Sequence, residues 1–192
     1  MLKQMWTLWA AALFAATAGA APTAQQIGQV QVFLSPEQAL AGAYPSASSF
    51  DGHMLSVTDS LRQRLRDSGA RSFGADSVAV YIARDSTHRL LGYAVIGDEI
   101  GKYRPITYLV AVDPQWQVSG VAILVYRESR GGEVRRQRFL RQYRGMDVAD
   151  PIRINQDIIN ITGATLSVRA LNAGVRRSLL LVQTAFHNAS ID

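Results

Sequence analysis

Two segments of the chain combine small residues with hydroxyl or charged side chains, and both could hold an anionic ligand. The first is Thr162-Gly163-Ala164-Thr165-Leu166-Ser167, immediately before a long stretch of helical periodicity. The start of a helix has unpaired N–H groups and a partial positive charge, so it favours a bound phosphate. Gly163 permits unusual backbone dihedrals, and the small Ala164 leaves the hydroxyl of Thr165 uncrowded. The other interpretation is that Thr165 or Ser167 is simply the N-cap of this helix.

The second segment is Tyr126-Arg127-Glu128-Ser129-Arg130-Gly131-Gly132-Glu133, at the end of an expected strand. A pair of glycines lets the backbone approach a ligand closely, and Arg127, Glu128 and Arg130 supply ionic and hydrogen-bonding groups. The alternative is a glycine turn with surface ion pairs, each of which contributes only about 0–1 kcal/mol. Taken separately, neither segment decides between these interpretations.

The composition limits the other chemistry that the chain can perform. It has no cysteine, which excludes disulfides, thiolate zinc sites, Cys-ligated iron–sulfur clusters and C-x-x-C-H haem attachment. The three histidines, His53, His88 and His187, are far apart without a partner at metal-ligand spacing, so we expect no structural metal. The formal net charge is +5. Because the charges lie on both sides of the apolar periods, we expect a solvated basic surface and no nucleic-acid partner.

The first twenty residues have the pattern of a secretory signal peptide. Lys3 precedes the apolar run Met5–Ala16, and Ala18-Gly19-Ala20 supplies a small-x-small cleavage pattern. The alternative is an uncleaved membrane anchor. A helix that spans a bilayer needs about 20 apolar residues, and this run is shorter. We therefore expect residues 1–20 to be removed by cleavage near Ala20, and a periplasmic protein with a single domain over residues 21–192.

The remaining pattern predicts an α+β domain, a twisted and largely antiparallel sheet flanked by helices. Runs with a period of two predict four strands, joined by connections too short for crossover helices, over residues 77–83, 89–96, 106–112 and 118–126. In the last run, Val121, Ile123 and Val125 are expected to share one face.

Four helices are expected around these strands. The first begins with a capping box at Ser35-Pro36-Glu37-Gln38 and ends at Tyr44-Pro45. The second is capped by Thr58-Asp59 and closed by Ser68-Gly69. The third is a basic helix over 133–144, and the last is an apolar helix over 167–187.

Together, and in this order, the two segments resemble the FMN-binding domain family, which includes the flavin-bearing subunits of the sodium-pumping NADH:quinone reductase and of the Rnf electron-transport complex. The similar stretch runs from Asp98 to Ser167. Its features are the Tyr-Arg-Glu-x-x-Gly-Gly-Glu segment from Tyr126, the Phe-x-x-Gln-aromatic-x-Gly end from Phe139, and the Thr-Gly-Ala-Thr motif. The resemblance implies an exported electron-transfer protein with FMN as its cofactor.

In this family, a Mg-dependent flavin transferase uses FAD to esterify the final threonine of the motif to the phosphate of FMN. By position, Thr165 is the acceptor in this chain. The usual pattern has an acid three residues before the motif, where this chain has Ile159, and Asp157 could substitute for it. Further cofactor contacts are expected at these positions: Lys102, Arg127, Glu128, Arg130, Thr162, Gly163, Ala164, Leu166 and Ser167.

The partners implied are the FAD-dependent transferase and a membrane or periplasmic redox protein. We expect the protein to act as a redox carrier and not as a stand-alone enzyme. Two alternatives stay open: a periplasmic flavin-dependent reductase of a small molecule, and a flavin-free interaction module of the same fold. A reductase should have an additional acid/base pair or a substrate-binding insertion, and the sequence indicates neither; nor does it contain a Gly-x-Gly-x-x-Gly fingerprint.

Overall fold

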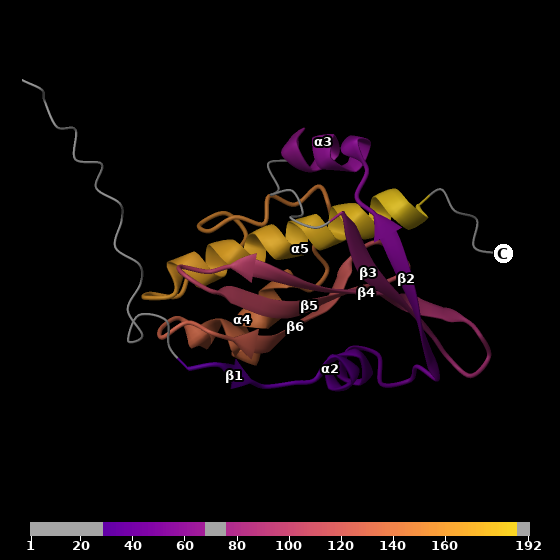
Figure 1. Cartoon of the computed structure of the whole chain (residues 1–192), viewed down its shortest axis with the longest axis horizontal. Helices are drawn as coiled ribbons and strands as arrows, with labels where there is room; N and C mark the ends of the chain where they lie inside the picture. Colours follow the sequence, from indigo (N-terminus) through magenta and orange to yellow (C-terminus); the bar gives the residue numbers. More distant parts are fainter. Residues whose placement is uncertain (1–28, 68–75, 188–192) are drawn as a thin grey trace, which may run out of the picture.

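The fold is known from a computed structural model that describes residues 29–67 and 76–187. The expected signal peptide at 1–20 and the expected helix end at Ser68-Gly69 lie outside these residues. A six-stranded sheet of order β1-β6-β5-β4-β3-β2 forms the centre (Figure 1), and every neighbouring pair of strands is antiparallel. The predicted α+β domain with an antiparallel sheet is therefore confirmed.

The strands include two that the sequence pattern did not predict. The predicted four correspond to β3 (Ser77–Arg84), β4 (Leu90–Ile100), β5 (Pro105–Val112) and β6 (Val118–Tyr126). The additional strands are β1 (Gln31–Val32) and β2 (Ser49–Ser56), which lie at the two edges of the sheet. Most residues of β2 are exposed and do not alternate between buried and exposed, so this strand has no period-two signal.

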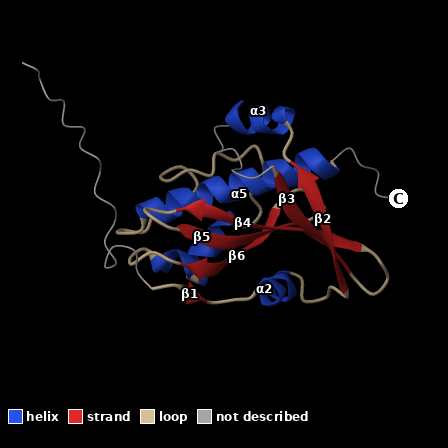
Figure 2. Cartoon of the chain, in the orientation of Figure 1, coloured by secondary structure: helices blue, strands red, loops and turns tan. Residues whose placement is uncertain are grey.

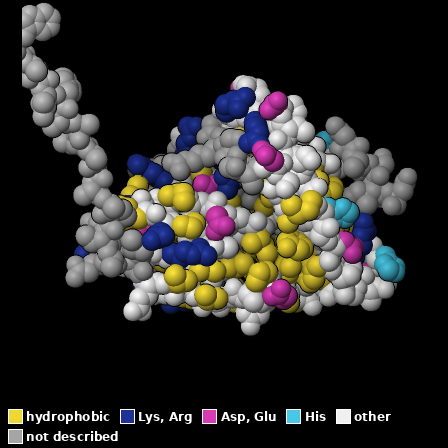
Figure 3. Space-filling view, viewed as in Figure 1, with side chains coloured by type: hydrophobic (Ala, Val, Ile, Leu, Met, Phe, Trp, Pro, Cys, Tyr) yellow, Lys and Arg dark blue, Asp and Glu magenta, His cyan; other side chains and the backbone are white. Residues whose placement is uncertain are grey.

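Helices cover the two faces of the sheet (Figure 2). The long helix α5 (Thr165–Phe186) packs its apolar side on one face, together with Leu61 and Leu65 of α3 (Asp59–Asp67). The short helix α2 (Pro36–Ala43) packs Ala39 and Leu40 on the other face. In Figure 3, hydrophobic side chains gather over the strands between α5 and α2.

The expected start of α2 is confirmed in detail. The Ser35 hydroxyl accepts a hydrogen bond from the Gln38 N–H at 3.2 Å, and the Gln38 amide accepts one from the Ser35 N–H at 2.9 Å. The helix ends at Ala43, with Tyr44 as its C-cap. Sequence pattern and structure agree here because a capping box is a local device that needs no tertiary contact.

The prediction of one helix over 133–144 is wrong. This segment contains three short turns, η1 (Gly132–Arg135), α4 (Gln137–Leu140) and η2 (Arg141–Tyr143), and Arg136 between the first two is extended. Val134 and Phe139 are both buried. Val134 and Phe139 are five positions apart, so in a continuous helix their side chains would point to nearly opposite sides. The break at Arg136 lets both side chains reach the core.

A β-bulge in β6 also alters the expected faces. Thr107 pairs with Val125 and Tyr108 pairs with Ile123, which leaves Leu124 as an extra residue. Val121 and Ile123 therefore pack on the α5 side as predicted, whereas Val125 packs on the α2 side. The same bulge turns Tyr126 towards α5, where its ring is buried.

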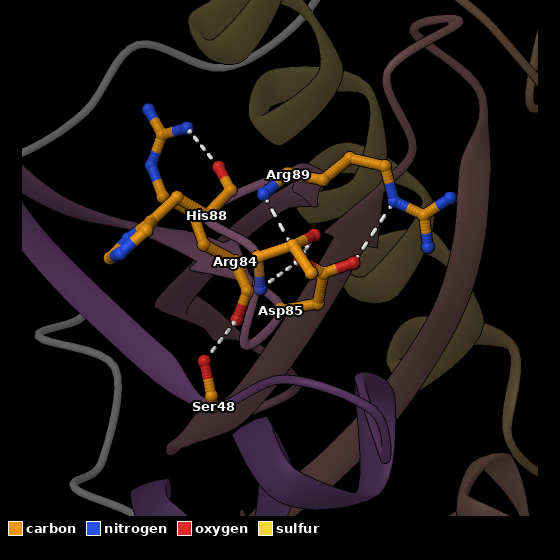
Figure 4. A network of polar contacts seen from close by, with 6 residues as sticks. Ser48, Arg84, Asp85, His88 and Arg89 are labelled. Carbon is orange, nitrogen blue, oxygen red and sulfur yellow. Dashed lines mark hydrogen bonds and ion pairs between the residues drawn. The ribbon is translucent and has the colours of Figure 1, made fainter.

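The turn between β3 and β4 is held by polar contacts (Figure 4). Asp85 accepts hydrogen bonds from the backbone N–H of Arg89 at 3.0 Å and from its Nε at 3.0 Å. Arg84 donates to the His88 carbonyl at 3.1 Å, and Ser48 donates to the Arg84 carbonyl at 3.3 Å. His88 has a φ of +62° and acts here as a turn residue.

Candidate functional site

The first turn of α5 presents unpaired backbone donors. The helix begins at Thr165, two residues earlier than predicted, and its first internal bond runs from the Val168 N–H to the Ala164 carbonyl at 2.9 Å. Within the described part of the chain, the N–H groups of Thr165, Leu166 and Ser167 have no acceptor. Gly163, just before the turn, has a φ of +83°, a left-handed conformation that favours glycine. Such a turn favours a phosphate.

No side chain caps this helix. The N-cap position is Ala164, and neither Thr165 nor Ser167 accepts a hydrogen bond from a backbone N–H of the first turn. The interpretation that one of these hydroxyls is simply an N-cap is therefore wrong. Both hydroxyls make contacts with other segments of the chain, and both border a cavity of about 570 Å³.

This cavity brings the two sequence segments together. Eight of the ten predicted site residues line it: Lys102, Glu128, Arg130, Gly163, Ala164, Thr165, Leu166 and Ser167. Its volume lies within the range of about 300–1,000 Å³ that is usual for small-molecule sites. Tyr103 and Ser129 also line it and were not predicted. They are sequence neighbours of the predicted Lys102 and Glu128, which is the only signal that could have indicated them.

The Thr165 hydroxyl is held by a residue that the sequence did not single out. The Asn160 side-chain Nδ2 donates a hydrogen bond to Thr165 Oγ1 at 2.9 Å. The other amide atom, Asn160 Oδ1, is buried without a partner among the described residues. Asp157, the expected substitute for an acid at Ile159, accepts instead from the N–H groups of Ile152 and Arg153 at 2.5 and 2.6 Å.

Ser167 connects the start of α5 to the glycine pair. The Tyr126 hydroxyl donates to the Arg130 carbonyl at 2.5 Å, so it accepts the proton of the Ser167 hydroxyl, 2.8 Å away. Burial raises the pKa of Tyr126, and the Ser167 hydrogen bond opposes this shift. Gly131, with a φ of +90°, has no room for a side chain: a Cβ would lie 2.7 Å from Ser167 Oγ. Glycine at position 131 therefore lets the backbone lie close to Ser167.

Glu128 organises one wall of the cavity. Its Oε1 accepts hydrogen bonds from the N–H groups of Tyr103 and Arg104 at 2.5 and 2.9 Å, and the residue is only 6% exposed. The carboxylate therefore holds the turn between β4 and β5, which carries Lys102. The Lys102 ammonium lies 4.7 Å from the centre of the Tyr103 ring. Lys102 and Arg130 are both exposed, and their charges border the cavity.

Two predicted residues do not line the cavity. Arg127 donates to the Pro105 carbonyl at 3.0 Å and to Thr107 Oγ1 at 2.9 Å, so its guanidinium is bonded to β5. Thr162 is exposed and lies outside the cavity lining. Both residues belong to the two segments that the sequence singled out, but the sequence could not indicate the direction of their side chains.

These features fit a phosphate-bearing cofactor. Three free N–H groups and two cationic side chains, Lys102 and Arg130, surround a hollow that also contains the Thr165 hydroxyl. The residues in 29–67 and 76–187 contain no cluster of three His, Cys, Asp or Glu that could hold a metal ion. No helix in these ranges is both long and apolar enough to cross a membrane.

Comparison with known proteins identifies the cofactor. Residues 101–180 match the family model of the FMN-binding domain, and this range contains every residue that lines the cavity. The fold is similar to that of NqrC from Shewanella oneidensis, with a TM-score of 0.51 and 17% identity over 73% of this chain and 83% of that chain. A search of curated proteins found no match. The match over residues 101–180 indicates that this part of the chain binds FMN.

Proposed function

We propose that the protein is an exported electron carrier whose FMN is attached through its phosphate to Thr165. The observation that carries this proposal is the position of Thr165 Oγ1, in the first turn of α5, bordering the cavity and beside three free N–H groups. An ester phosphate at this oxygen would meet those N–H groups without moving the helix. Lys102 and Arg130 would neutralise the remaining negative charge.

The attachment step needs a flavin transferase and FAD as the flavin donor. Thr165 Oγ1 forms a bond to the phosphorus of the FMN half of FAD, the pyrophosphate bond breaks, AMP leaves, and the hydroxyl proton is released. The Asn160 Nδ2 holds the oxygen in place while its proton stays available. Ile159 stands where the family has an acid, and the side chain that contacts the acceptor hydroxyl directly in this chain is the Asn160 amide.

An electron carrier fits the cavity better than a reductase does. FMN supplies the transfer of one or two electrons, and the protein must leave it within reach of a partner. Five cavity residues are exposed, so a redox protein can approach this rim: Lys102, Ser129, Arg130, Gly163 and Leu166. We propose a membrane-bound donor and a periplasmic or membrane acceptor, consistent with the signal-peptide pattern of residues 1–20.

The test is co-expression with a flavin transferase, followed by denaturation and precipitation of the protein. Flavin should stay with the wild-type pellet, and a peptide that contains Thr165 should gain the mass of FMN less water. Thr165→Val keeps the shape of the side chain without its hydroxyl and should lose both signals. Thr165→Ser and Thr162→Ala should keep them. Release of all flavin from the wild-type protein into the supernatant would refute covalent attachment and leave dissociable FMN binding.

Carrier and reductase are distinguished by steady-state assays of the flavin-loaded protein. A carrier should be reoxidised by several artificial acceptors and quinones without preference, and it should accept electrons poorly from NADH. Saturable turnover of one small molecule with NADH, in the absence of any partner protein, would instead establish a reductase. A chain that retains no flavin under any condition would establish the interaction module.

A further inference from the structure

A second basic hollow, of about 330 Å³, lies along α5. Arg169 and Arg176 on the helix border it, and Arg153 reaches it from the loop that precedes the helix. From the 1.5 Å rise per residue, these helix positions lie about 6 and about 16 Å from Thr165 along the axis. The hollow shares no lining residue with the FMN cavity.

The guanidinium groups of Arg153 and Arg176 in this hollow repel each other. Burial lowers the pKa of Arg176, the charge of Arg153 lowers it further, and Asp157 opposes the shift. Both carboxylate oxygens of Asp157 already accept short hydrogen bonds from the backbone N–H groups of Ile152 and Arg153. Arg153, Arg169 and Arg176 all border the hollow, so a negative charge placed in it would be attracted by all three guanidinium groups.

A buried amide adds a neutral donor to the same hollow. Asn172 borders it and is only 6% exposed. Its Oδ1 accepts a hydrogen bond from the buried hydroxyl of Tyr143 at 2.6 Å, which fixes the amide plane. The Nδ2 has no partner among the described residues, and it remains available to a ligand in the hollow. A bound oxygen in the hollow would give this N–H group an acceptor.

The loop that carries Arg153 has an unusual backbone conformation. Ile152 has a φ of +45°, a left-handed conformation that β-branched residues rarely adopt. The two hydrogen bonds to Asp157 hold this conformation. A strained backbone conformation persists only where the surrounding structure holds it in place, and such conformations cluster at ligand sites. Here it fixes the residue directly before Arg153.

We propose that this hollow binds a phosphate-type oxyanion at a site separate from FMN. The donor set contains planar guanidinium forks and one amide N–H, which match the several oxygens of a phosphate. The positive charge excludes a metal cation, and the polar donors disfavour an apolar ligand. The phosphate could be inorganic, or it could belong to the headgroup of an anionic lipid; the recognition chemistry is the same.

The test uses the FMN-loaded protein, so that the phosphate-binding turn of α5 is already occupied. Inorganic phosphate is titrated at constant ionic strength, and the Asn172 side-chain and arginine Nε–H signals are followed by NMR. We expect saturable shifts of these signals. Arg169→Gln and Arg176→Gln should each raise the Kd about tenfold or more, because each removes a charged hydrogen bond. Arg141→Gln, which changes an exposed arginine outside the hollow, should leave the Kd unchanged.

Vesicle flotation then identifies the source of the phosphate. Binding to vesicles of phosphatidylcholine with phosphatidic acid, but not to phosphatidylcholine alone, and its loss in Arg169→Gln and Arg176→Gln, would assign a lipid headgroup. Phosphate shifts without vesicle binding would assign a free phosphate. The proposal is overturned if phosphate produces no saturable shift, if chloride has the same effect, or if only residues around Thr165 respond.

Discussion

Gly131→Ala is the substitution for which the structure gives the clearest energetic expectation. The new Cβ would lie 2.7 Å from Ser167 Oγ and 2.8 Å from the Tyr126 hydroxyl, both closer than real contacts allow. Neither neighbour can move aside easily, because Ser167 is 4% exposed on α5 and Tyr126 is 2% exposed beneath it. Alanine at a φ of +90° adds about 1–2 kcal/mol of backbone strain. Loss of the Ser167–Tyr126 hydrogen bond adds about 0.5–1.5 kcal/mol.

The expected loss of unfolding free energy is therefore about 2–4 kcal/mol, the sum of strain, hydrogen bond and clash. Gly145→Ala is the matched control: its φ is +77°, but a Cβ there meets no atom within 4 Å. It should lose only the backbone strain of about 1–2 kcal/mol. Urea unfolding of both variants, followed by tryptophan fluorescence and circular dichroism, measures the difference.

A second variant isolates the clash from other effects. Ser167→Ala removes one of the two atoms that the new methyl would strike, so it should cost less in the Gly131→Ala background than in the wild type. Equal stabilities of Gly131→Ala and Gly145→Ala would refute the reasoning. Additive effects of Gly131→Ala and Ser167→Ala would show that the two residues are not in contact.

Three further predictions concern single side chains. Asn160→Ala should slow covalent FMN attachment about 2- to 12-fold, since a neutral hydrogen bond contributes about 0.5–1.5 kcal/mol; in-gel flavin fluorescence over time measures the rate. Glu99→Gln should destabilise the fold by about 3–5 kcal/mol because it leaves the buried Arg177 charge without its ion-pair partner, 2.7 Å away; denaturant unfolding measures this loss, and replacement of both residues by methionine should cost less. A hydrogen bond from the Thr87 hydroxyl, joined by backbone N–H groups, lowers the pKa of Asp85 from 3.8 to about 2. Its stabilising effect is thus present above about pH 4 and is lost as the pH falls towards 2, so the stabilities of Asp85→Asn and wild type should converge over that interval.

Where local chemistry determines the structure, the sequence was sufficient to predict it. The capping box of α2 and the four central strands depend on residues close together in the chain. The break at Arg136 and the bulge at Leu124 depend on the sheet and on α5, which lie far away in sequence. Periodicity alone therefore predicted one continuous helix across Arg136 and one uniform strand face across Leu124.

The same distinction applies to the site. Small residues and hydroxyls at the start of a helix predicted the position of Thr165 and half of the residues that line the cavity. The contact from Asn160 was not predictable, because it depends on how the loop before α5 folds back on the helix. The direction of Arg127 was not predictable either, since its partners on β5 become neighbours only when the sheet forms.

The position of the FMN-binding turn also depends on contacts three turns along α5. Arg177 donates to the Tyr108 hydroxyl and to the Asp98 carbonyl, both at 3.0 Å, in addition to its ion pair with Glu99. At Gly174 a Cβ would lie 2.5 Å from the Tyr108 ring, so only glycine allows the helix to lie this close to β5. These contacts fix the distance of α5 from the sheet. Because the helix is continuous, they also determine where its first turn meets the end of β6, and this turn is where we propose that the phosphate of FMN is held.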